Sequence, residues 1–130
     1  MESLLVTLIL WLSINAGINI DTLPKVEFLK GTEIVHLYGK PALALYAHKA
    51  KTIYLDERIN LETGQGKSTL LHELVHHYQN ISGKMAGYEC SHASERLAYE
   101  VQRDYLLSEG FELMPQLTPF NIAMKSICTY

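Results

Sequence analysis

The residues best suited to chemistry form a His-Glu-x-x-His segment near the middle of the chain. His72, Glu73 and His76 lie in a run of apolar residues whose spacing predicts an α-helix over about residues 67–81. On this helix the histidines are four residues apart, so both imidazoles lie on one face and can bind one Zn²⁺ ion. Glu73 lies about 100° around the helix from His72, beside the metal face. A carboxylate there can act as a general base on a metal-bound water.

A third metal ligand is expected elsewhere in the chain, because a catalytic zinc site usually has three protein ligands and one open position. Four downstream side chains are candidates: Glu89, His92, Glu95 and Glu100. Glu95 is the best of them, because it begins a helical face with Ala98 at its centre, and a small residue lets two helices approach closely. His92 lies one turn earlier and is the alternative ligand. Glu100 points to another side of the same helix.

The composition limits the classes of protein to which the chain can belong. Its 130 residues suffice for one domain with a hydrophobic core, and 48% hydrophobic and 19% charged residues are ordinary for a globular protein. The net charge is −3 and basic residues form no runs, so nucleic acid is not expected as a partner. Residues 1–130 are therefore predicted to form a single domain.

The N-terminal apolar stretch has two interpretations. Residues 4–14 are too short for a membrane span and have the length of a signal-peptide core. However, residue 2 is Glu2 and no Lys or Arg precedes Lys25, whereas a signal peptide normally begins with a positive charge. We therefore favour a buried helix over residues 4–15, with Trp11 as its largest anchor, over an uncleaved export signal.

Two cysteines, Cys90 and Cys128, allow at most one disulfide. If they are bonded, they connect the last predicted helix to the loop before the preceding helix, and they favour a periplasmic or secreted protein. Two buried free thiols are the equally weighted alternative, since the sequence does not give the distance between the two residues.

Short strands are predicted at three places. Alternating polar and apolar residues predict a strand over residues 25–29 with Val26 and Phe28 facing inward. Two apolar runs over residues 42–46 and 52–55 predict a hairpin. Together these segments predict a small, mostly antiparallel sheet.

Three main helices are predicted besides the His-Glu-x-x-His helix. They cover residues 4–15, about residues 91–108, and a segment that begins at Thr118-Pro119, with Thr118 as N-cap and proline in the first helical position. A further short helix has Thr32 as its expected N-cap. The fold class is therefore α+β, with the sheet packed on the His-Glu-x-x-His helix. The expected inward face of the last helix comprises Phe120, Ala123, Met124 and Ile127.

The combination of motifs resembles a known group of enzymes. His72-Glu73-x-x-His76, followed by a glutamate on the next predicted helix, is similar to the gluzincin branch of the zincin metallopeptidases. The resemblance implies that His72, His76 and Glu95 bind zinc and that Glu73 activates water. It also implies that the helices and the small sheet form a minimal zincin-like domain.

A closer resemblance, to a family of small bacterial zincin-like domains, covers most of the chain. It is carried by the His-Glu-x-x-His segment together with two further motifs: Trp11-Leu12-x-x-Asn15 and Cys90-x4-Glu95-x-x-Ala98-Tyr99-x-x-Gln102. In zincins, a strand above the active-site helix binds an extended substrate by backbone pairing. The resemblance and the physics of strand addition therefore indicate residues 52–55 as that edge strand.

Two other motifs are incomplete. The metzincin branch requires a glycine and a third histidine at positions that hold Gln79 and Ser82. The segment 64–69 resembles the end of a phosphate-binding loop, but the glycine required five residues before Gly66 is Leu61. We therefore interpret this segment as a flexible, capping lead-in to the helix.

Several polar residues near the motif have open roles. Gln102 and Asn80 could orient a ligand imidazole or only form an interhelical hydrogen bond. His77 points away from His76 and is either a support of the site or a surface residue. Tyr99 could donate to a developing oxyanion, but packing of its ring is favoured.

The predicted function is that of a zinc-dependent metallohydrolase that cleaves a peptide or amide bond, with Glu73 as the catalytic base. The alternative is a zinc-binding zincin-like module without peptidase activity. A structural site has no need of a base at Glu73, and closed structural sites are usually rich in thiolates, which favours the enzyme.

Overall fold

The structure is a computed structural model that describes residues 1–128. Its elements follow in the order α1 (Glu2–Ala16), β1 (Lys25–Leu29), α2 (Gly31–Tyr38), β2 (Ala44–Ala47), β3 (Thr52–Asp56), α3 (Gly64–Ile81), the 3₁₀ turn η1 (Lys84–Gly87), α4 (Ser91–Ser108), the 3₁₀ turn η2 (Pro115–Leu117) and α5 (Pro119–Lys125). The predicted α+β class is confirmed. None of the described helices is long and apolar enough to cross a membrane.

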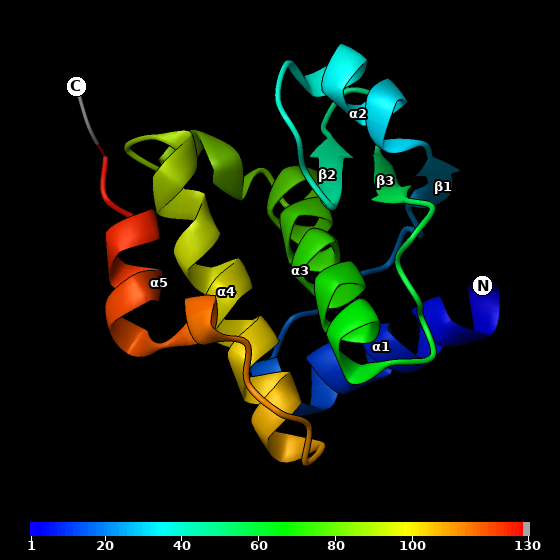
Figure 1. The fold of residues 1–130 in the computed structure, drawn as a ribbon. Coiled ribbons are helices and arrows are strands. Elements are labelled where there is room, and N and C mark those ends of the chain that lie inside the picture. The colour runs from blue at the N-terminus through cyan, green and yellow to red at the C-terminus, as the bar shows by residue number, and fades with distance from the viewer. Residues whose placement is uncertain (129–130) are drawn as a thin grey trace.

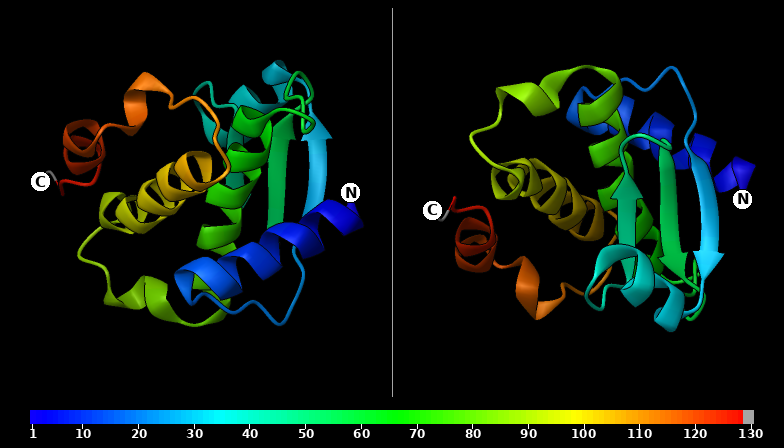
Figure 2. Two further views of the ribbon diagram at one scale, coloured as in Figure 1. Left: turned by 90° about the horizontal axis from the view of Figure 1, so that it is seen from below. Right: turned by 90° about the horizontal axis from the view of Figure 1, so that it is seen from above.

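The helix α3 lies at the centre of the molecule (Figure 1). One side of it faces the sheet, and α4 packs against the other side, with α5 outside α4 (Figures 1 and 2). Leu70, Leu71, Leu74 and Val75 are fully buried, so α3 supplies the middle of the core. A helix covered on both sides is held in one position, which is what a site built on its His-Glu-x-x-His face requires.

The three-stranded sheet is mixed rather than mostly antiparallel. The strand order is β1-β3-β2, in which β1 pairs with β3 in parallel and β2 pairs with β3 in antiparallel register. The burial of β3 agrees with its central position. Four of its residues are buried, as in a strand covered on both faces: Thr52, Ile53, Leu55 and Asp56. The prediction that residues 52–55 form the edge strand is therefore wrong, and the edge strand beside α3 is β2.

The first helix packs into the domain, as predicted for residues 4–15. It ends at Gly17, which has a left-handed φ of 65°. The ring of Trp11 contacts Tyr105 edge-on, with centroids 5.2 Å apart. One face is buried through Leu5, Leu8 and Leu12, whereas the opposite face is exposed through Val6, Leu10 and Ile14. The expected burial on all sides is therefore correct for one face only.

Three local predictions differ from the structure. Phe28 is 46% exposed, because β1 is an edge strand whose second half has little cover. The N-cap of α2 is Lys30 rather than Thr32, and the Lys30 backbone N–H donates to the Glu33 side chain. The seven-residue α5 buries Ile122 beside Leu117, so the expected inward residues are largely exposed: Phe120, Met124 and Ile127. Thr118 caps α5 as predicted, accepting from the Asn121 N–H.

The segment that resembled a phosphate loop is helical. Thr63 caps α3 by accepting from the Gly66 N–H, and the helix begins at Gly64, three residues earlier than expected. Both glycines are required by close packing rather than by flexibility. A Cβ on Gly66 would lie 2.0 Å from the carbonyl oxygen of Asn60, and one on Gly64 would lie 2.3 Å from the Phe111 ring.

Cys90 and Cys128 form a disulfide, so the alternative of two free thiols is wrong. The bond joins the residue before α4 to the segment that follows α5. Because α4 carries Glu95, the bond holds α5 against the helix that carries this candidate ligand.

Replacing both cysteines by serine is expected to lower the free energy of unfolding by about 4 kcal/mol, because the bond spans 38 residues and constrains the unfolded chain. Urea denaturation with and without reductant measures the effect. The reductant should destabilise the parent protein by a similar amount and leave the double variant unchanged. A loss below about 1 kcal/mol would contradict this expectation.

Candidate metal centre

Side chains from α3 and α4 converge at one point. The Nε2 atom of His72 lies 3.2 Å from Oε1 of Glu95, and Nε2 of His76 contacts the same oxygen. The two histidines are one turn apart on α3, and Glu95 faces them because α4 packs alongside α3. The structure thus brings together the three residues that the sequence indicated as metal ligands.

Glu73 lies beside this cluster and is buried. His72, Glu73 and His76 each offer a ligand atom, and these atoms lie within 4.8 Å of one another. The Oε2 atom of Glu73 has no hydrogen-bond partner among the described residues, although it is buried. Burial raises the pKa of the Glu73 carboxyl, against the opposing charges of His72 and His76. A buried carboxylate that keeps one oxygen unpaired is costly for stability, which points to a use other than structure.

A glutamine on α4 orients His72. The Nδ1 atom of His72 lies 2.9 Å from Oε1 of Gln102, and the amide nitrogen of Gln102 donates to the Ser68 hydroxyl at 3.3 Å. An amide oxygen only accepts, so His72 carries its proton on Nδ1, and in the neutral ring its Nε2 lone pair points at Glu95. The hypothesis that Gln102 orients a ligand imidazole is consistent with this contact.

A second glutamine orients His76 in the same way. Oε1 of Gln79 lies 2.8 Å from Nδ1 of His76, while its amide nitrogen donates to the Tyr88 hydroxyl and to the Ser94 carbonyl, both at 2.9 Å. Sequence reasoning missed this role, although the i, i+3 spacing from His76 could have indicated it. Asn80 had been considered instead, and it donates to Tyr46 and to the backbone of residue 48.

His77 holds the helix in place rather than taking part in the site. It is fully buried, its Nδ1 lies 2.7 Å from the Tyr46 hydroxyl on β2, and its Nε2 lies 2.6 Å from the Thr22 carbonyl. The carbonyl accepts from Nε2–H, so Nδ1 accepts from Tyr46. Burial lowers the pKa of His77, which favours this neutral form. These bonds fix α3 relative to the strand beside the site.

The charges within the cluster are strongly coupled. Burial lowers the pKa of His76, but the hydrogen bond to Glu95 and the charges of Glu73 and Glu95 outweigh it and raise this pKa to about 9. Burial raises the pKa of Glu95, yet the hydrogen bonds from His72 and His76 leave it well below its usual range. The cluster therefore attracts a cation, whether a proton or a metal ion.

The donor set fits zinc. Two imidazole nitrogens and one carboxylate oxygen form one of the three-ligand sets found in catalytic zinc sites. Both Nδ1 atoms are engaged by glutamine oxygens, so an imidazole that gives up its Nε2 proton to a metal ion presents a lone pair toward the Glu95 oxygen. Two nitrogen lone pairs and a carboxylate oxygen that are directed at one point repel one another unless a cation lies between them.

Tyr99 lies next to the cluster. Its ring contacts His72 at 4.5 Å between centroids, and it lines a cavity together with Glu73 and Glu95. Burial and the nearby carboxylates raise the pKa of Tyr99 to about 12, so its hydroxyl keeps its proton and can donate. The ring packs as expected, and its position also allows the donor role.

The other candidate ligands are less well placed. His92 is exposed, and among the described residues no hydrogen bond or ion pair joins it to Glu95 or to the two histidines. Glu100 is exposed and accepts a hydrogen bond from Arg96 at 2.8 Å. Glu89 is exposed as well, and the structure favours Glu95, which is the candidate that contacts both histidines.

Two cavities flank the centre and share Glu73 and Glu95 as lining residues. The first, which we call the Lys125 cavity, measures about 330 Å³ and extends toward η2 and α5. The second, which we call the His48 cavity, measures about 450 Å³ and extends toward η1 and the start of α4. Both are bounded by residues of the segment 38–44. Together they form a groove that passes over the cluster, alongside β2.

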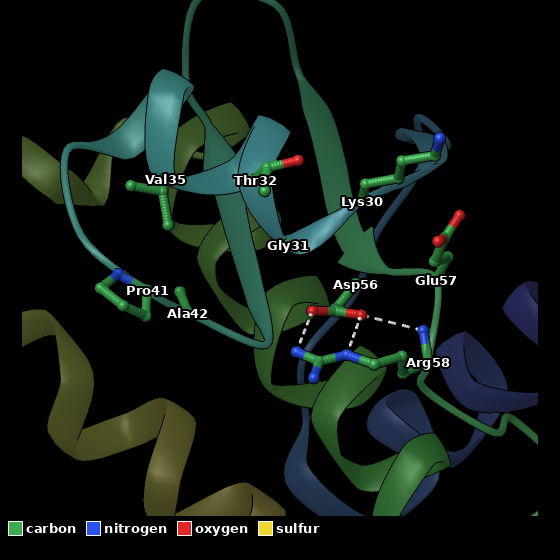
Figure 3. A pocket seen from close by; sticks show the side chains of 9 residues that line it. All are labelled: Lys30, Gly31, Thr32, Val35, Pro41, Ala42, Asp56, Glu57 and Arg58. Carbon is green, nitrogen blue, oxygen red and sulfur yellow. Dashed lines mark hydrogen bonds and ion pairs between the residues drawn. The ribbon is translucent and has the colours of Figure 1, made fainter.

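A larger cavity of about 670 Å³ lies at the start of α2 and shares Pro41 and Ala42 with the Lys125 cavity (Figure 3). Its one aspartate, Asp56, is bound by Arg58 through two side-chain bonds of 2.9 and 2.7 Å. These bonds from Arg58 lower the pKa of Asp56 to about 2. The cavity is lined by no histidine or cysteine, and its aspartate is already paired, so the candidate site remains the groove.

Replacing Gln102 with leucine is expected to weaken zinc binding by about 10- to 100-fold, because His72 loses the partner that fixes its tautomer and orientation. Competition with a coloured chelator measures the affinity, and circular dichroism monitors the fold. Gln65→Leu, on the exposed first turn of α3, is the matched control and should bind zinc as the parent does. Equal affinities for the two variants would show that the Gln102 contact does not support the site.

The fold and this cluster define an α+β domain with a His-His-Glu group between two packed helices. The family model described as a domain of unknown function (DUF6647) matches residues 1–130, and the chain belongs to that family. No match was found among curated proteins or among solved structures.

Proposed function

We propose that this protein is a zinc-dependent metallohydrolase of the gluzincin type that cleaves peptide bonds. The observation that carries the proposal is the convergence of His72 and His76, through their Nε2 atoms, on one oxygen of Glu95. A purely structural site has no use for the fourth residue, Glu73, whose buried carboxylate has an unpaired oxygen. The resemblance of the motifs to the gluzincins supports the same assignment.

Each residue of the site has its own role in the proposed reaction. His72, His76 and Glu95 would hold the metal, and Gln102 and Gln79 keep the two imidazoles in the tautomer that leaves Nε2 free. Bound zinc lowers the pKa of a coordinated water and polarises a carbonyl oxygen. The Glu73 carboxylate would take a proton from the attacking water and pass it to the leaving amine.

Two further features suit a peptide substrate. Tyr99 retains its proton and can donate a hydrogen bond to negative charge that develops on the substrate oxygen. The strand β2 has β3 as its one neighbour in the sheet, so its free edge can pair with an extended peptide in the groove. A substrate peptide that pairs with β2 would lie over Glu73 and Glu95, because these residues line the same cavity as β2.

The disulfide supports an oxidising compartment for this activity. Bonded cysteines are typical of secreted and periplasmic proteins and are rare in the cytosol. We therefore propose a periplasmic or secreted location.

Chelation and metal replacement test the proposal. A mixture of fluorogenic peptides with all residue types at the cleaved bond should be hydrolysed by the zinc-loaded protein. Hydrolysis should stop after treatment with a chelator and return on addition of one equivalent of zinc. If zinc binds but no peptide is cleaved, the alternative of a metal-binding module without peptidase activity is correct.

A further inference from the structure

Two lysines from different parts of the chain line the Lys125 cavity. Lys40 belongs to the segment that joins α2 to β2, and Lys125 is the last residue of α5. The amine of Lys40 lies 5.3 Å from the centroid of Tyr38, and that of Lys125 lies 4.7 Å from the centroid of Tyr99. Both rings belong to the same cavity, so each ammonium group is held at the cavity by an aromatic surface.

Neither lysine has a carboxylate partner among the described residues. The ion pairs of this part of the chain involve Asp56, Glu95 and Glu100, each with an arginine or a histidine. The carboxylates that line the Lys125 cavity are Glu73 and Glu95, and both belong to the candidate metal centre. The two ammonium groups therefore bring positive charge to the Lys125 cavity, and no ion pair among the described residues neutralises it.

The position of this charge relative to the cluster is defined by contacts. Lys125 lies over the ring of Tyr99, and the same ring packs against His72. One aromatic ring thus separates the Lys125 side chain from a candidate metal ligand. A substrate whose scissile bond lies at the cluster would place a neighbouring residue, rather than a distant one, beside the two lysines.

We propose that the groove selects substrates that carry a carboxylate next to the scissile bond, and that Lys40 and Lys125 bind this carboxylate. The inference rests on the proposed function for the identity of the substrate as a peptide. The carboxylate belongs either to an aspartate or glutamate side chain or to a free C-terminus. Both lysines are exposed, and an ammonium group attracts a carboxylate from either source.

The structure also explains why the opposite end of the groove differs. The His48 cavity shares Lys40 but not Lys125, and the other lining side chains outside the cluster that can carry positive charge are His48 and His92. Burial and the charge of His76 lower the pKa of His48, so this residue is mainly neutral at pH 7. Lys125 therefore gives the α5 side one lysine more than the other side of the groove, which gives the substrate a direction along β2.

Binding of uncleaved peptides tests the proposal without reference to hydrolysis. The probes are four acetylated tripeptides: Ala-Ala-Ala with a free C-terminus, Ala-Ala-Ala amide, Ala-Asp-Ala amide and Ala-Asn-Ala amide. Titrations followed by NMR chemical shifts are made with the metal-free protein and with the zinc-loaded Glu73→Gln variant, which is expected to retain zinc without cleaving the probes. We expect the preferred acid to bind about tenfold more tightly than its neutral counterpart, with about three- to fivefold lost in each of Lys40→Gln and Lys125→Gln.

Lys25→Gln, in the exposed start of β1, is the matched control and should keep the full preference. The free tripeptide against its amide reports recognition of a C-terminus, and the Asp–Asn pair reports recognition of an acidic side chain. A preference for acids that persists in the Lys40→Gln/Lys125→Gln double variant, or that is absent from the parent protein, overturns the proposal. Because the metal-free protein is also titrated, a failure of zinc binding leaves the lysine test intact, and the two failures are distinguishable.

Discussion

Replacing His72 with alanine is expected to abolish stoichiometric zinc binding. In the parent protein, zinc at about a thousand times its dissociation constant should raise the free energy of unfolding by about 4 kcal/mol, which corresponds to a rise in the melting temperature of roughly 10 °C or more. The variant keeps one imidazole and one carboxylate of the convergent group and should show no such rise. Elemental analysis of the purified proteins, together with calorimetric melting with and without zinc, measures both effects.

The chain supplies matched controls for this result. His92→Ala removes an exposed histidine one turn before Glu95 on α4 and should leave zinc binding unchanged. Glu95→Gln should lose zinc as His72→Ala does, whereas Glu100→Gln, on the same helix, should not. If Glu95→Gln retained one equivalent of zinc while Glu73→Gln lost it, the ligand set would be His72, Glu73 and His76, whose ligand atoms are also close together.

Much of this site could be predicted from spacing along helices. The i, i+4 relation of His72 and His76 places both side chains on one face without knowledge of the tertiary fold. The sequence favours Glu95 because the small residue Ala98, one turn later, lets a second helix approach closely. In the structure α4 packs against α3, and Ala98 is fully buried. Periodicity within each helix therefore sufficed to bring together side chains that are far apart in the chain.

The sheet was predicted less well, because strand order depends on contacts that the local pattern does not contain. An alternating segment such as residues 25–29 can pair in either direction with any exposed edge. The uninterrupted run of β-branched, aromatic and apolar residues over 52–55 could have indicated a central strand, since such a run has side chains to bury on both faces of the sheet. Had that been recognised, β2 rather than β3 would have been assigned to the edge of the groove.

The packing role of the glycines at the start of α3 and the role of Gln79 were not predicted, for a different reason. Glycine is common in loops, so Gly64 and Gly66 suggested a loop. Their actual role is to leave room for the Phe111 ring and for the Asn60 backbone, which pack closely against them. Gln79 and Gln102 form ordinary hydrogen bonds, and their importance depends on which atom they contact. Close packing and hydrogen-bond direction are properties of the assembled structure, which a pattern in one chain does not encode.

The second large effect is expected for Glu73→Gln, which should retain zinc and lose hydrolysis. A glutamine has nearly the same shape as the glutamate but does not take up a proton at neutral pH, so the rate should fall by about 10²- to 10⁴-fold. Zinc stoichiometry should remain at one equivalent, because Glu95 rather than Glu73 contacts both Nε2 atoms. Initial rates on the best peptide of the mixture, measured at equal zinc loading, test the effect.

The stability of the same variant provides an independent measurement. The Glu73 carboxylate is buried with one oxygen unpaired, so replacing it by a neutral amide removes the cost of burying a charge. The metal-free variant should therefore be at least as stable toward urea as the metal-free parent, as expected where an active site sacrifices stability for function. Glu62→Gln, an exposed glutamate before α3, is the matched control and should change neither rate nor stability.

A Glu73→Gln variant that hydrolyses peptides at the parent rate would remove Glu73 from the mechanism, and one that loses zinc would make Glu73 a ligand.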